Sequence, residues 1–439
     1  MTIFGLANRI VAMKLFGSSG IRRISDGNLF GLTLKVASAM GKKYKRVIIG
    51  CDTRTSSDAL KHMAMAGMLA SGAKVFDAGL LPTPTLALAA RRFEAAVMIT
   101  ASHNPPEYNG MKLINPDGSA FGPQQQKEIQ ELVSDPSLGM VSWDKLQNSA
   151  IYHGAIEQHV HHIRKYFPGA HKIKVVVDCV CGAASTITPY LLQGMGCDVL
   201  SLNSNPSGFF PHPVEPLETN LQDLINAVRE SHADLGLAHD GDADRLVGVD
   251  GRGRFINGDK MMCLLAQTLN ARKVVTTVDA SSVVEKFGYS VERTAVGDSF
   301  VSEELKKGGD FGGEPSGAWI FPQNTLCPDG IFAAGCIVSI TSQGRLIQML
   351  DAIPTYHNLR SNVAHDGIDM EQLEARLIAR FEPLAVNRLD GIKLTLPEGW
   401  MLVRPSGTEP KIRITVEGID SEWVLEVHDR AVKIITGDA

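Results

Sequence analysis

Cysteine is scarce in this chain of 439 residues, and the seven cysteines form no recognisable pattern. Their number is odd and no two are spaced as Cys-x-x-Cys, so we expect neither a disulfide framework nor a structural zinc site. Long apolar runs are also missing, because the longest, at residues 331–340, is about half the length that a membrane helix needs. Arg9 and Lys14 interrupt the apolar residues near the start, which is not the layout of a signal peptide. We therefore expect a cytoplasmic protein with no membrane partner.

An excess of positive charge is absent too. Lysine and arginine number 43 against 48 aspartates and glutamates, which gives a net charge of −5 with histidine neutral. A basic surface for nucleic acid is therefore not expected, and an anionic substrate would need a local cluster of cations. Hydrophobic residues at 44% and charged residues at 21% are typical of a folded protein, which excludes a disordered, collagen-like or coiled-coil chain.

What the sequence does contain is a recurring order of short apolar run, polar or glycine-rich loop and helix-like stretch. The runs lie at residues 47–52, 96–102, 175–178, 235–240 and 274–279. Because they are apolar on both faces, we interpret them as buried strands of a mostly parallel sheet covered by helices. The sequence thus predicts an α/β fold whose polar loops at the carboxyl ends of strands bind ligands.

The length predicts about three domains of roughly 150 residues. Residues 134–150 are polar and are interpreted as a linker, whereas the tail from residue 360 has the pattern of a small α+β unit. The expected segments are 1–150, 151–254, 255–359 and 360–439.

The sharpest motif is Asp-Gly-Asp-Ala-Asp-Arg at residues 240–245, directly after a predicted buried strand. A hard divalent cation takes several oxygen ligands, and small spacer residues let the backbone curl around it. An EF-hand is excluded, because its sixth and twelfth positions would hold Arg245 and Gly251. A solvated acidic turn is the alternative, although three carboxylates in five residues repel strongly without a cation.

The second motif, at residues 100–112, is Thr-Ala-Ser-His-Asn-Pro-Pro-Glu-Tyr-Asn-Gly-Met-Lys. A serine at the end of a strand is exposed and can act as a nucleophile, although Ser102 lacks the Gly-x-Ser-x-Gly elbow of serine hydrolases. His103 is its neighbour, and neighbouring side chains on an extended chain point apart, which disfavours a Ser–His pair. An ordinary polar turn is the alternative.

Three further loops combine hydroxyl groups, glycine and charge. Residues 404–413, Arg-Pro-Ser-Gly-Thr-Glu-Pro-Lys-Ile-Arg, suit a phosphate dianion, with a plain turn before a strand as the alternative. Residues 17–23 offer hydroxyls and two cations, and residues 312–318 offer a carboxylate and a hydroxyl to a sugar. Taken alone, residues 17–23 are equally typical of an ordinary surface loop, and residues 312–318 are equally typical of a glycine-rich hairpin without a ligand. The chain has neither a Walker A motif nor a Gly-x-Gly-x-x-Gly fingerprint.

Together and in this order, the five loops resemble those of the α-D-phosphohexomutase family, which includes phosphoglucomutases, phosphomannomutases and phosphoglucosamine mutases. The resemblance extends from about Met13 to the end of the chain. It implies three related mixed-sheet α/β domains and a smaller C-terminal α+β domain around a central cleft, in agreement with the segments above.

The resemblance also implies roles for individual residues. Ser102 is the expected phosphoserine, and its oxygen would bind one Mg²⁺ together with Asp240, Asp242 and Asp244. Near the reacting centre we expect Arg22, Arg245 and Lys112, the last as a candidate general acid or base. The expected substrate contacts are Ser18, His103, Glu314, Ser316, Arg404, Ser406, Gly407, Thr408 and Arg413.

The implied reaction moves a phosphoryl group between the 1- and 6-positions of a hexose or hexosamine phosphate, with a sugar 1,6-bisphosphate as intermediate and activator. The Asp-Ala-Asp form of the metal loop favours glucosamine phosphate. Glucose, mannose or pentose phosphate specificity stays open, as do a metal-dependent sugar phosphatase, a non-catalytic phosphosugar-binding protein and assembly as a homodimer. Two positions depart from the family pattern, Ala318 where many relatives have histidine and Ser299 where several have a basic residue.

Overall fold

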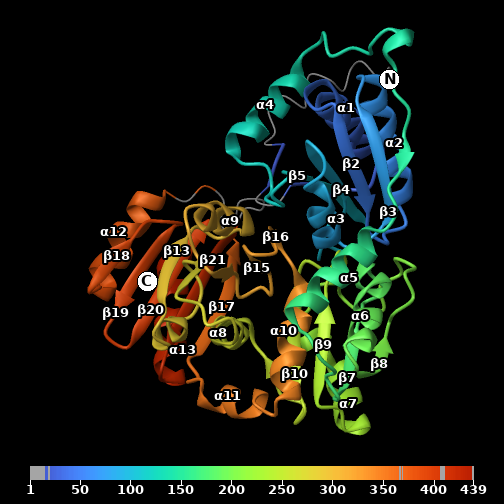
Figure 1. Cartoon of the computed structure of the whole chain (residues 1–439). Helices are drawn as coiled ribbons and strands as arrows, with labels where there is room; N and C mark the ends of the chain where they lie inside the picture. Colours follow the sequence, from blue (N-terminus) through green and yellow to red (C-terminus); the bar gives the residue numbers. More distant parts are fainter. Residues whose placement is uncertain (1–14, 18–19, 365–366, 368, 406–410, 438–439) are drawn as a thin grey trace.

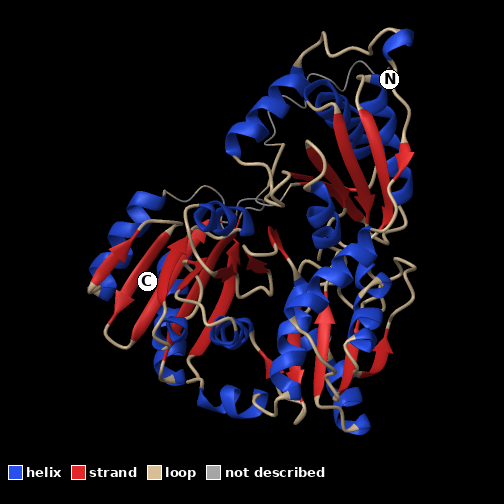
Figure 2. Cartoon of the chain, in the orientation of Figure 1, coloured by secondary structure: helices blue, strands red, loops and turns tan. Residues whose placement is uncertain are grey.

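The structure of the chain is a computed structural model that describes residues 15–17, 20–364, 367, 369–405 and 411–437. Within these residues it has four β-sheets, and we call each sheet with its helices a unit, numbered one to four along the chain (Figure 1). Figure 2 shows that helices flank the sheets of the first three units, whereas the fourth unit is a sheet with few helices.

The first unit has a six-stranded sheet of order β1-β5-β4-β2-β3-β6. Its strands are β1 (Ile21–Ile24), β2 (Arg46–Cys51), β3 (Lys74–Leu80), β4 (Ala95–Ile99), β5 (Tyr108–Ile114) and β6 (Ala150–Ile151), and its helices are α1 (Gly27–Lys43), α2 (Ser57–Ala70), α3 (Thr83–Ala90) and α4 (Pro123–Ser134). β2 runs parallel to β3 and β4, whereas β5 is antiparallel to both β4 and β1. The loop with Ser102 therefore connects two antiparallel strands, and Lys112 lies on the second of them.

The second unit has a five-stranded sheet of order β11-β10-β9-β7-β8. Its elements are α5 (Ala155–Tyr166), β7 (Lys174–Asp178), α6 (Thr188–Gly194), β8 (Asp198–Leu202), α7 (Gln222–Ser231), β9 (Leu235–His239), β10 (Leu246–Asp250) and β11 (Phe255–Ile256). β7 is parallel to β8 and β9, but β9 and β10 form an antiparallel hairpin. The acidic motif is the turn of this hairpin.

The third unit repeats that plan with the order β13-β12-β14-β15-β16. Its elements are α8 (Gly258–Thr268), β12 (Lys273–Thr277), β13 (Ser290–Thr294), α9 (Asp298–Lys306), β14 (Phe311–Gly313), β15 (Trp319–Phe321), β16 (Thr325–Pro328), α10 (Gly330–Ser342) and α11 (Leu346–Ala352). β12 is parallel to β13 and β14, and β14 and β15 form a hairpin whose turn is the Gly-Glu-Pro-Ser-Gly segment.

The fourth unit is antiparallel throughout, in the order β17-β21-β20-β19-β18. Its elements are β17 (His357–Ala364), α12 (Met370–Phe381), β18 (Ala385–Asn387), β19 (Ile392–Leu396), β20 (Gly399–Pro405), β21 (Lys411–Gly418) and α13 (Ser421–Thr436). Leu373 and Leu377 of α12 and Val424 and Val427 of α13 share one core with the strands. The predicted α/β fold with a smaller C-terminal α+β part is confirmed. The sheets of the first three units are mixed, as the family resemblance implied, and the mostly parallel sheet predicted from the apolar runs is wrong, because antiparallel strands end each sheet.

The longest apolar run of the sequence is α10, which is buried along most of its length and belongs to a core shared by the second and third units. In Figure 1, α10 lies beside β9 and β10 of the second unit, although it belongs to the third unit in sequence. Over the described ranges no single helix is long and apolar enough to cross a membrane; the one pair of helices that passes by length and composition, α10 with α11, is bent by 99°.

Asp329 caps α10 and joins three units. Its Oδ1 accepts hydrogen bonds from the amides of Ile331 and Phe332, and its Oδ2 lies 3.0 Å from Nε2 of His159 on α5. The other ring nitrogen of His159 lies 2.9 Å from the hydroxyl of Thr85 on α3. Because Asp329 and His159 are fully buried, their polar atoms need partners within the protein, and Nε2 of His159 has its partner in Asp329.

We predict that Asp329→Ala lowers the free energy of unfolding by about 3–5 kcal/mol, because the buried His159 ring loses its partner. Urea unfolding followed by circular dichroism measures this. Asp26→Ala is the matched control, since Asp26 caps α1 with the same two-amide geometry but is exposed, and should cost only about 1 kcal/mol. Equal losses in the two variants would show that the buried link contributes nothing.

Candidate active site

Ser102 lies in the loop after β4, against the acidic turn of the second unit. The residue is 1% exposed, and its hydroxyl donates a hydrogen bond of 2.8 Å to Oδ2 of Asp240. The prediction of an exposed serine is therefore wrong. The backbone of Ser102 has a φ of +54°, and Nδ1 of His103 lies 3.3 Å from the serine oxygen. The prediction that the two side chains point apart is also wrong, because it assumed an extended backbone.

The three aspartates of the acidic turn converge in a buried cluster. One carboxylate oxygen from each of Asp240, Asp242 and Asp244 lies within 4.8 Å of the other two. Burial and then repulsion from Asp244 and Asp242 raise the pKa of Asp240 well above its usual value. The Oδ1 atoms of Asp242 and Asp244 are buried and have no hydrogen-bond partner among the described residues. Unpartnered anionic oxygens at this spacing fit a hard divalent cation such as Mg²⁺.

Lys112 extends from β5 into the same cluster. Its ammonium donates to Oδ2 of Asp242 at 2.6 Å and to Oδ2 of Asp244 at 2.5 Å. Burial alone would lower the pKa of Lys112, but the two carboxylates outweigh it and raise the pKa above its usual value. Lys112 is therefore charged in this arrangement and offsets part of the negative charge of the turn.

Two arginines complete the cationic side of the site. Arg245 follows the aspartates, and its guanidinium forms an ion pair of 3.2 Å with Glu215. Its carbonyl accepts a hydrogen bond from Nδ1 of His239, which fixes the end of the turn. Arg22 lies on β1 and donates to Oδ1 of Asn104 at 3.2 Å, in the Ser102 loop. Both arginines thus lie beside the predicted reacting centre.

The predicted sugar loop lies next to Arg245. Ala318 forms an isolated β-bridge with Arg245, and this bridge joins the hairpin turns of the second and third units. Burial, then the charges of Asp298 and Asp279, raise the pKa of Glu314 to about 8. At neutral pH this carboxyl is mostly protonated and can both donate to and accept from a sugar hydroxyl. The hydroxyl of Ser316 is buried and lacks a partner within the part of the chain that the structure describes.

The predicted phosphate loop is only partly described. Ser406, Gly407 and Thr408 lie outside the described residues, as does Ser18 of the first loop. Arg404 and Arg413 are direct cross-strand partners on β20 and β21, so their side chains lie on the same face of the sheet. Arg404 forms an ion pair of 3.0 Å with Asp390, whose same oxygen accepts from the amide of Val296 in the third unit. The contacts described above gather the three aspartates, Lys112, His103 and Arg22 around Ser102, and the bridge from Arg245 to Ala318 joins the sugar loop to them. Arg404, with its partner Arg413, is held at the junction of the third and fourth units.

Comparison with known proteins assigns nearly the whole chain to one family. Three models of the phosphoglucomutase/phosphomannomutase α/β/α domains I, II and III match residues 13–138, 152–253 and 257–356, and the model of the C-terminal domain matches residues 368–434. The chain belongs to the phosphoglucomutase/phosphomannomutase family. The resemblance to the α-D-phosphohexomutases that we inferred from the five loops is confirmed.

Relatives of this phosphohexomutase chain include a probable phosphoglucosamine mutase of Methanocella arvoryzae, 46% identical over 96% of this chain and 98% of the relative. The phosphoglucosamine mutase of Methanococcus maripaludis is 36% identical over 96% and 98%. Among solved structures, a phosphoglucomutase/phosphomannomutase family protein of Burkholderia thailandensis superimposes with a TM-score of 0.87 at 25% identity, covering 97% of this chain and 98% of that one.

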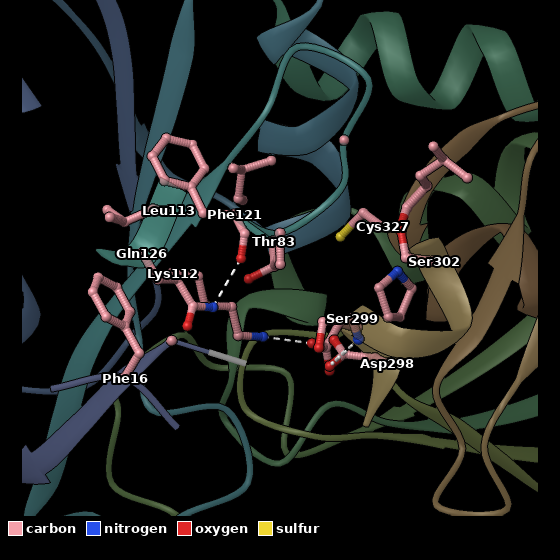
Figure 3. A pocket seen from close by; sticks show the side chains of 17 residues that line it. Phe16, Thr83, Lys112, Leu113, Phe121, Gln126, Asp298, Ser299, Ser302 and Cys327 are labelled. Atoms are coloured by element: carbon pink, nitrogen blue, oxygen red, sulfur yellow. Dashed lines mark hydrogen bonds and ion pairs between the residues drawn. The ribbon is translucent and has the colours of Figure 1, made fainter. Parts of the chain in front are cut away.

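A small cavity is lined by Lys112 and by other residues of the first and third units of the phosphohexomutase fold. Figure 3 shows Thr83 and Lys112 on one side of it and Ser299, Ser302 and Cys327 on the other. Its volume of about 30 Å³ has room for about two water molecules.

Some site residues carried no signal in the sequence. Thr83 donates to Oδ2 of Asp242 at 2.5 Å, Glu215 pairs with Arg245, and Asp390 pairs with Arg404. None of the three lies in a motif, and Thr83 and Glu215 are also at least 30 residues from their partners in the sequence. For Asp390 the Asp-Gly pair at 390–391 signalled a turn but not its contact.

We predict that Asp242→Asn weakens Mg²⁺ binding at least about tenfold, since changes even behind the ligands of a metal site cost that much. Isothermal titration calorimetry with Mg²⁺ alone measures the affinity. The control is Asp250→Asn at the other end of β10, where the carboxylate pairs with Arg254, and its affinity should match the wild type. Unchanged affinity in Asp242→Asn would remove this residue from the metal site.

Proposed function

We propose that this chain is a Mg²⁺-dependent phosphoglucosamine mutase, in which Ser102 carries the phosphoryl group between the 6- and 1-positions of the sugar. The observation that carries the proposal is the 2.8 Å hydrogen bond from the Ser102 hydroxyl to Asp240, inside the buried carboxylate cluster. A serine that only stabilised its own turn would have no reason to donate to Asp240, a carboxylate of the acidic cluster of another unit. The glucosamine specificity is supported by relatives that bear this name across the length of the chain.

Asp240, Asp242 and Asp244 would hold one Mg²⁺ together with an oxygen of phosphorylated Ser102. When bound, the ion withdraws charge from the transferring phosphoryl group. The unpartnered Oδ1 atoms of Asp242 and Asp244 support this assignment, because an acceptor-only oxygen buried without a donor is costly.

The remaining work of the site is positioning and charge neutralisation, which dominate phosphoryl transfer. A sugar hydroxyl forms a bond to phosphorus, while the bond from phosphorus to the Ser102 oxygen breaks and that oxygen keeps the electron pair. The proton that the sugar hydroxyl loses ends on the Ser102 oxygen, which becomes a hydroxyl again. The bisphosphorylated sugar then turns around and returns its other phosphoryl group to Ser102. Arg22, Lys112 and Arg245 supply positive charge around this centre.

Sugar recognition is assigned to Glu314 and Ser316, and the phosphate that does not react is assigned to Arg404 and Arg413 with the loop between them. A protonated Glu314 suits this role, because it can exchange donor and acceptor roles as the sugar reverses its orientation. Escape of the bisphosphate would leave Ser102 without phosphate, so a sugar 1,6-bisphosphate is the expected activator.

The test is turnover of glucosamine, glucose, mannose and ribose 1-phosphates with Mg²⁺, with product identification and intact mass of the enzyme. We expect the highest kcat/KM for glucosamine phosphate, partial phosphorylation of the wild type, and reactivation of dephosphorylated enzyme by bisphosphate. Ser102→Ala should show neither activity nor the phosphoryl increment. Release of inorganic phosphate without an isomer would identify a phosphatase instead, and higher kcat/KM for another sugar would overturn the glucosamine assignment.

We predict that Arg404→Ala raises the KM for the sugar phosphate about ten- to a hundredfold, because a charge-assisted hydrogen bond contributes about 1.5–3 kcal/mol. The dependence of the variant's activity on Mg²⁺ concentration should stay close to that of the wild type. Arg388→Ala is the control, since Arg388 pairs with Glu374 on the surface of the same unit. An unchanged KM in Arg404→Ala would exclude this residue from the phosphate site.

A further inference from the structure

Arg54, which no motif singled out, lies in the loop after β2 and is 2% exposed. Its guanidinium donates to five acceptors. Nη2 donates to the carbonyls of Ser102 and Asn104 at 2.8 and 2.6 Å, and Nη1 donates to those of Pro105 and Tyr108 at 2.6 and 2.9 Å. Nε donates to Oδ2 of Asp52 at 3.2 Å. All five N–H groups of the arginine are therefore used.

Four of these acceptors are backbone carbonyls of one loop, residues 102–108, which contains the nucleophile. This loop has reasons to need an external support. Ser102 adopts a positive φ that a residue with a side chain rarely takes, and Pro105 and Pro106 have no amide to offer to hydrogen bonds within the loop. Arg54 supplies from one rigid, planar group the donors that the loop itself lacks.

A second chain of hydrogen bonds, through Thr100, connects Asp52 to the amide of Ser102. Oδ2 of Asp52 accepts from the hydroxyl of Thr100 at 2.7 Å, and the oxygen of that hydroxyl accepts from the amide of Ser102 at 2.8 Å. The peptide groups on both sides of the Ser102 side chain are thus fixed, the carbonyl by Arg54 and the amide by Thr100.

Arg54 and the neighbouring backbone also contact residues of the second unit. The ring of Phe210 lies over the Arg54 guanidinium at 5.2 Å from its centroid. Gly208 approaches so closely that a Cβ there would be 2.0 Å from the carbonyl oxygen of Thr53. Gly241 approaches the Ser102 carbonyl from the acidic turn in the same way, with a Cβ position 2.7 Å from its oxygen. The loop with Ser102 is therefore clamped where the first and second units meet.

We propose that Arg54 is a positioning residue for phosphoryl transfer, which holds the Ser102 oxygen in place against the three aspartates. This inference rests on the proposed function, because it assumes that Ser102 carries the phosphoryl group. Arg54 itself contacts no reacting atom, and its effect passes through the backbone of the loop. Lysine cannot replace it, because an ammonium group has only three N–H donors, whereas Arg54 donates to five acceptors.

The variant Arg54→Lys separates positioning from charge. We expect kcat to fall about a hundredfold or more, since a displacement of about 1 Å at the reacting atoms costs that much. KM should stay within about threefold, because Glu314, Ser316, Arg404 and Arg413, to which sugar and phosphate binding are assigned, lie on other loops. Phosphorylation of dephosphorylated enzyme by sugar 1,6-bisphosphate, followed by intact mass, should slow by a similar factor.

Two further variants make the test decisive. Arg46→Lys is the matched control, because Arg46 lies at the start of β2 over the rings of Phe76 and Phe93 and should retain wild-type kcat. Thr100→Val keeps the shape of the side chain and removes both hydrogen bonds of its hydroxyl, the one to Asp52 and the one from the Ser102 amide, so it should lower kcat about tenfold with little change in KM. It decides the matter if Arg54→Lys does not fold.

The outcomes distinguish the inference from the function on which it rests. A wild-type enzyme without mutase activity or phosphate on Ser102 would remove the proposed function. An active wild type with unchanged kcat in a folded Arg54→Lys would overturn only the role of Arg54, as would unchanged kcat in Thr100→Val. A loss of kcat that merely follows the fraction of unfolded protein, with normal turnover per folded molecule, would also overturn it.

Discussion

Negative charge gathered in one buried turn is the constraint on which the rest of the site depends. Asp240, Asp242 and Asp244 are nearly inaccessible to solvent, and their oxygens lie within 4.8 Å of one another. Such a turn is stable only with compensating cations or donors. Lys112 and Thr83 supply these from the first unit. The same interactions that neutralise the turn therefore also hold two units together and bring Ser102 to the aspartates.

Four of the five predicted loops have the same place in their sheets. Each of them connects two antiparallel strands: β4 to β5, β9 to β10, β14 to β15 and β20 to β21. A connection of this kind is short and well anchored on both sides, which suits side chains that must be held closely. The parallel strands of the first three units form the supporting framework, and the antiparallel pairs at one side carry the residues to which we assign the reaction.

The sequence was sufficient for the α/β class and for the C-terminal α+β part, because these depend on local patterns, and for the family, because five motifs occur in the family's order. It was insufficient where geometry arises from distant residues. The exposure predicted for Ser102 failed because a turn from another unit covers it. The separation predicted for Ser102 and His103 failed because of one positive φ. Glu215, Asp390 and Arg54 were missed because their contacts join loops that no spacing rule connects.

The distribution of apolar cores has a consequence for how the molecule opens. The second and third units share one core, in which Val175 and Leu237 belong to the same cluster as Phe311 and Phe332. The fourth unit has a large core made from its own strands and helices, and it shares with the third unit only a small apolar cluster of Val278, Trp400 and Leu402 among the described residues. Residues of the shared core must therefore lose their packing in one cooperative event, whereas the fourth unit can open as a separate foldon. Backbone amides of α12 and α13 would then exchange with solvent through local openings, while those of α10 would exchange only when both central units come apart.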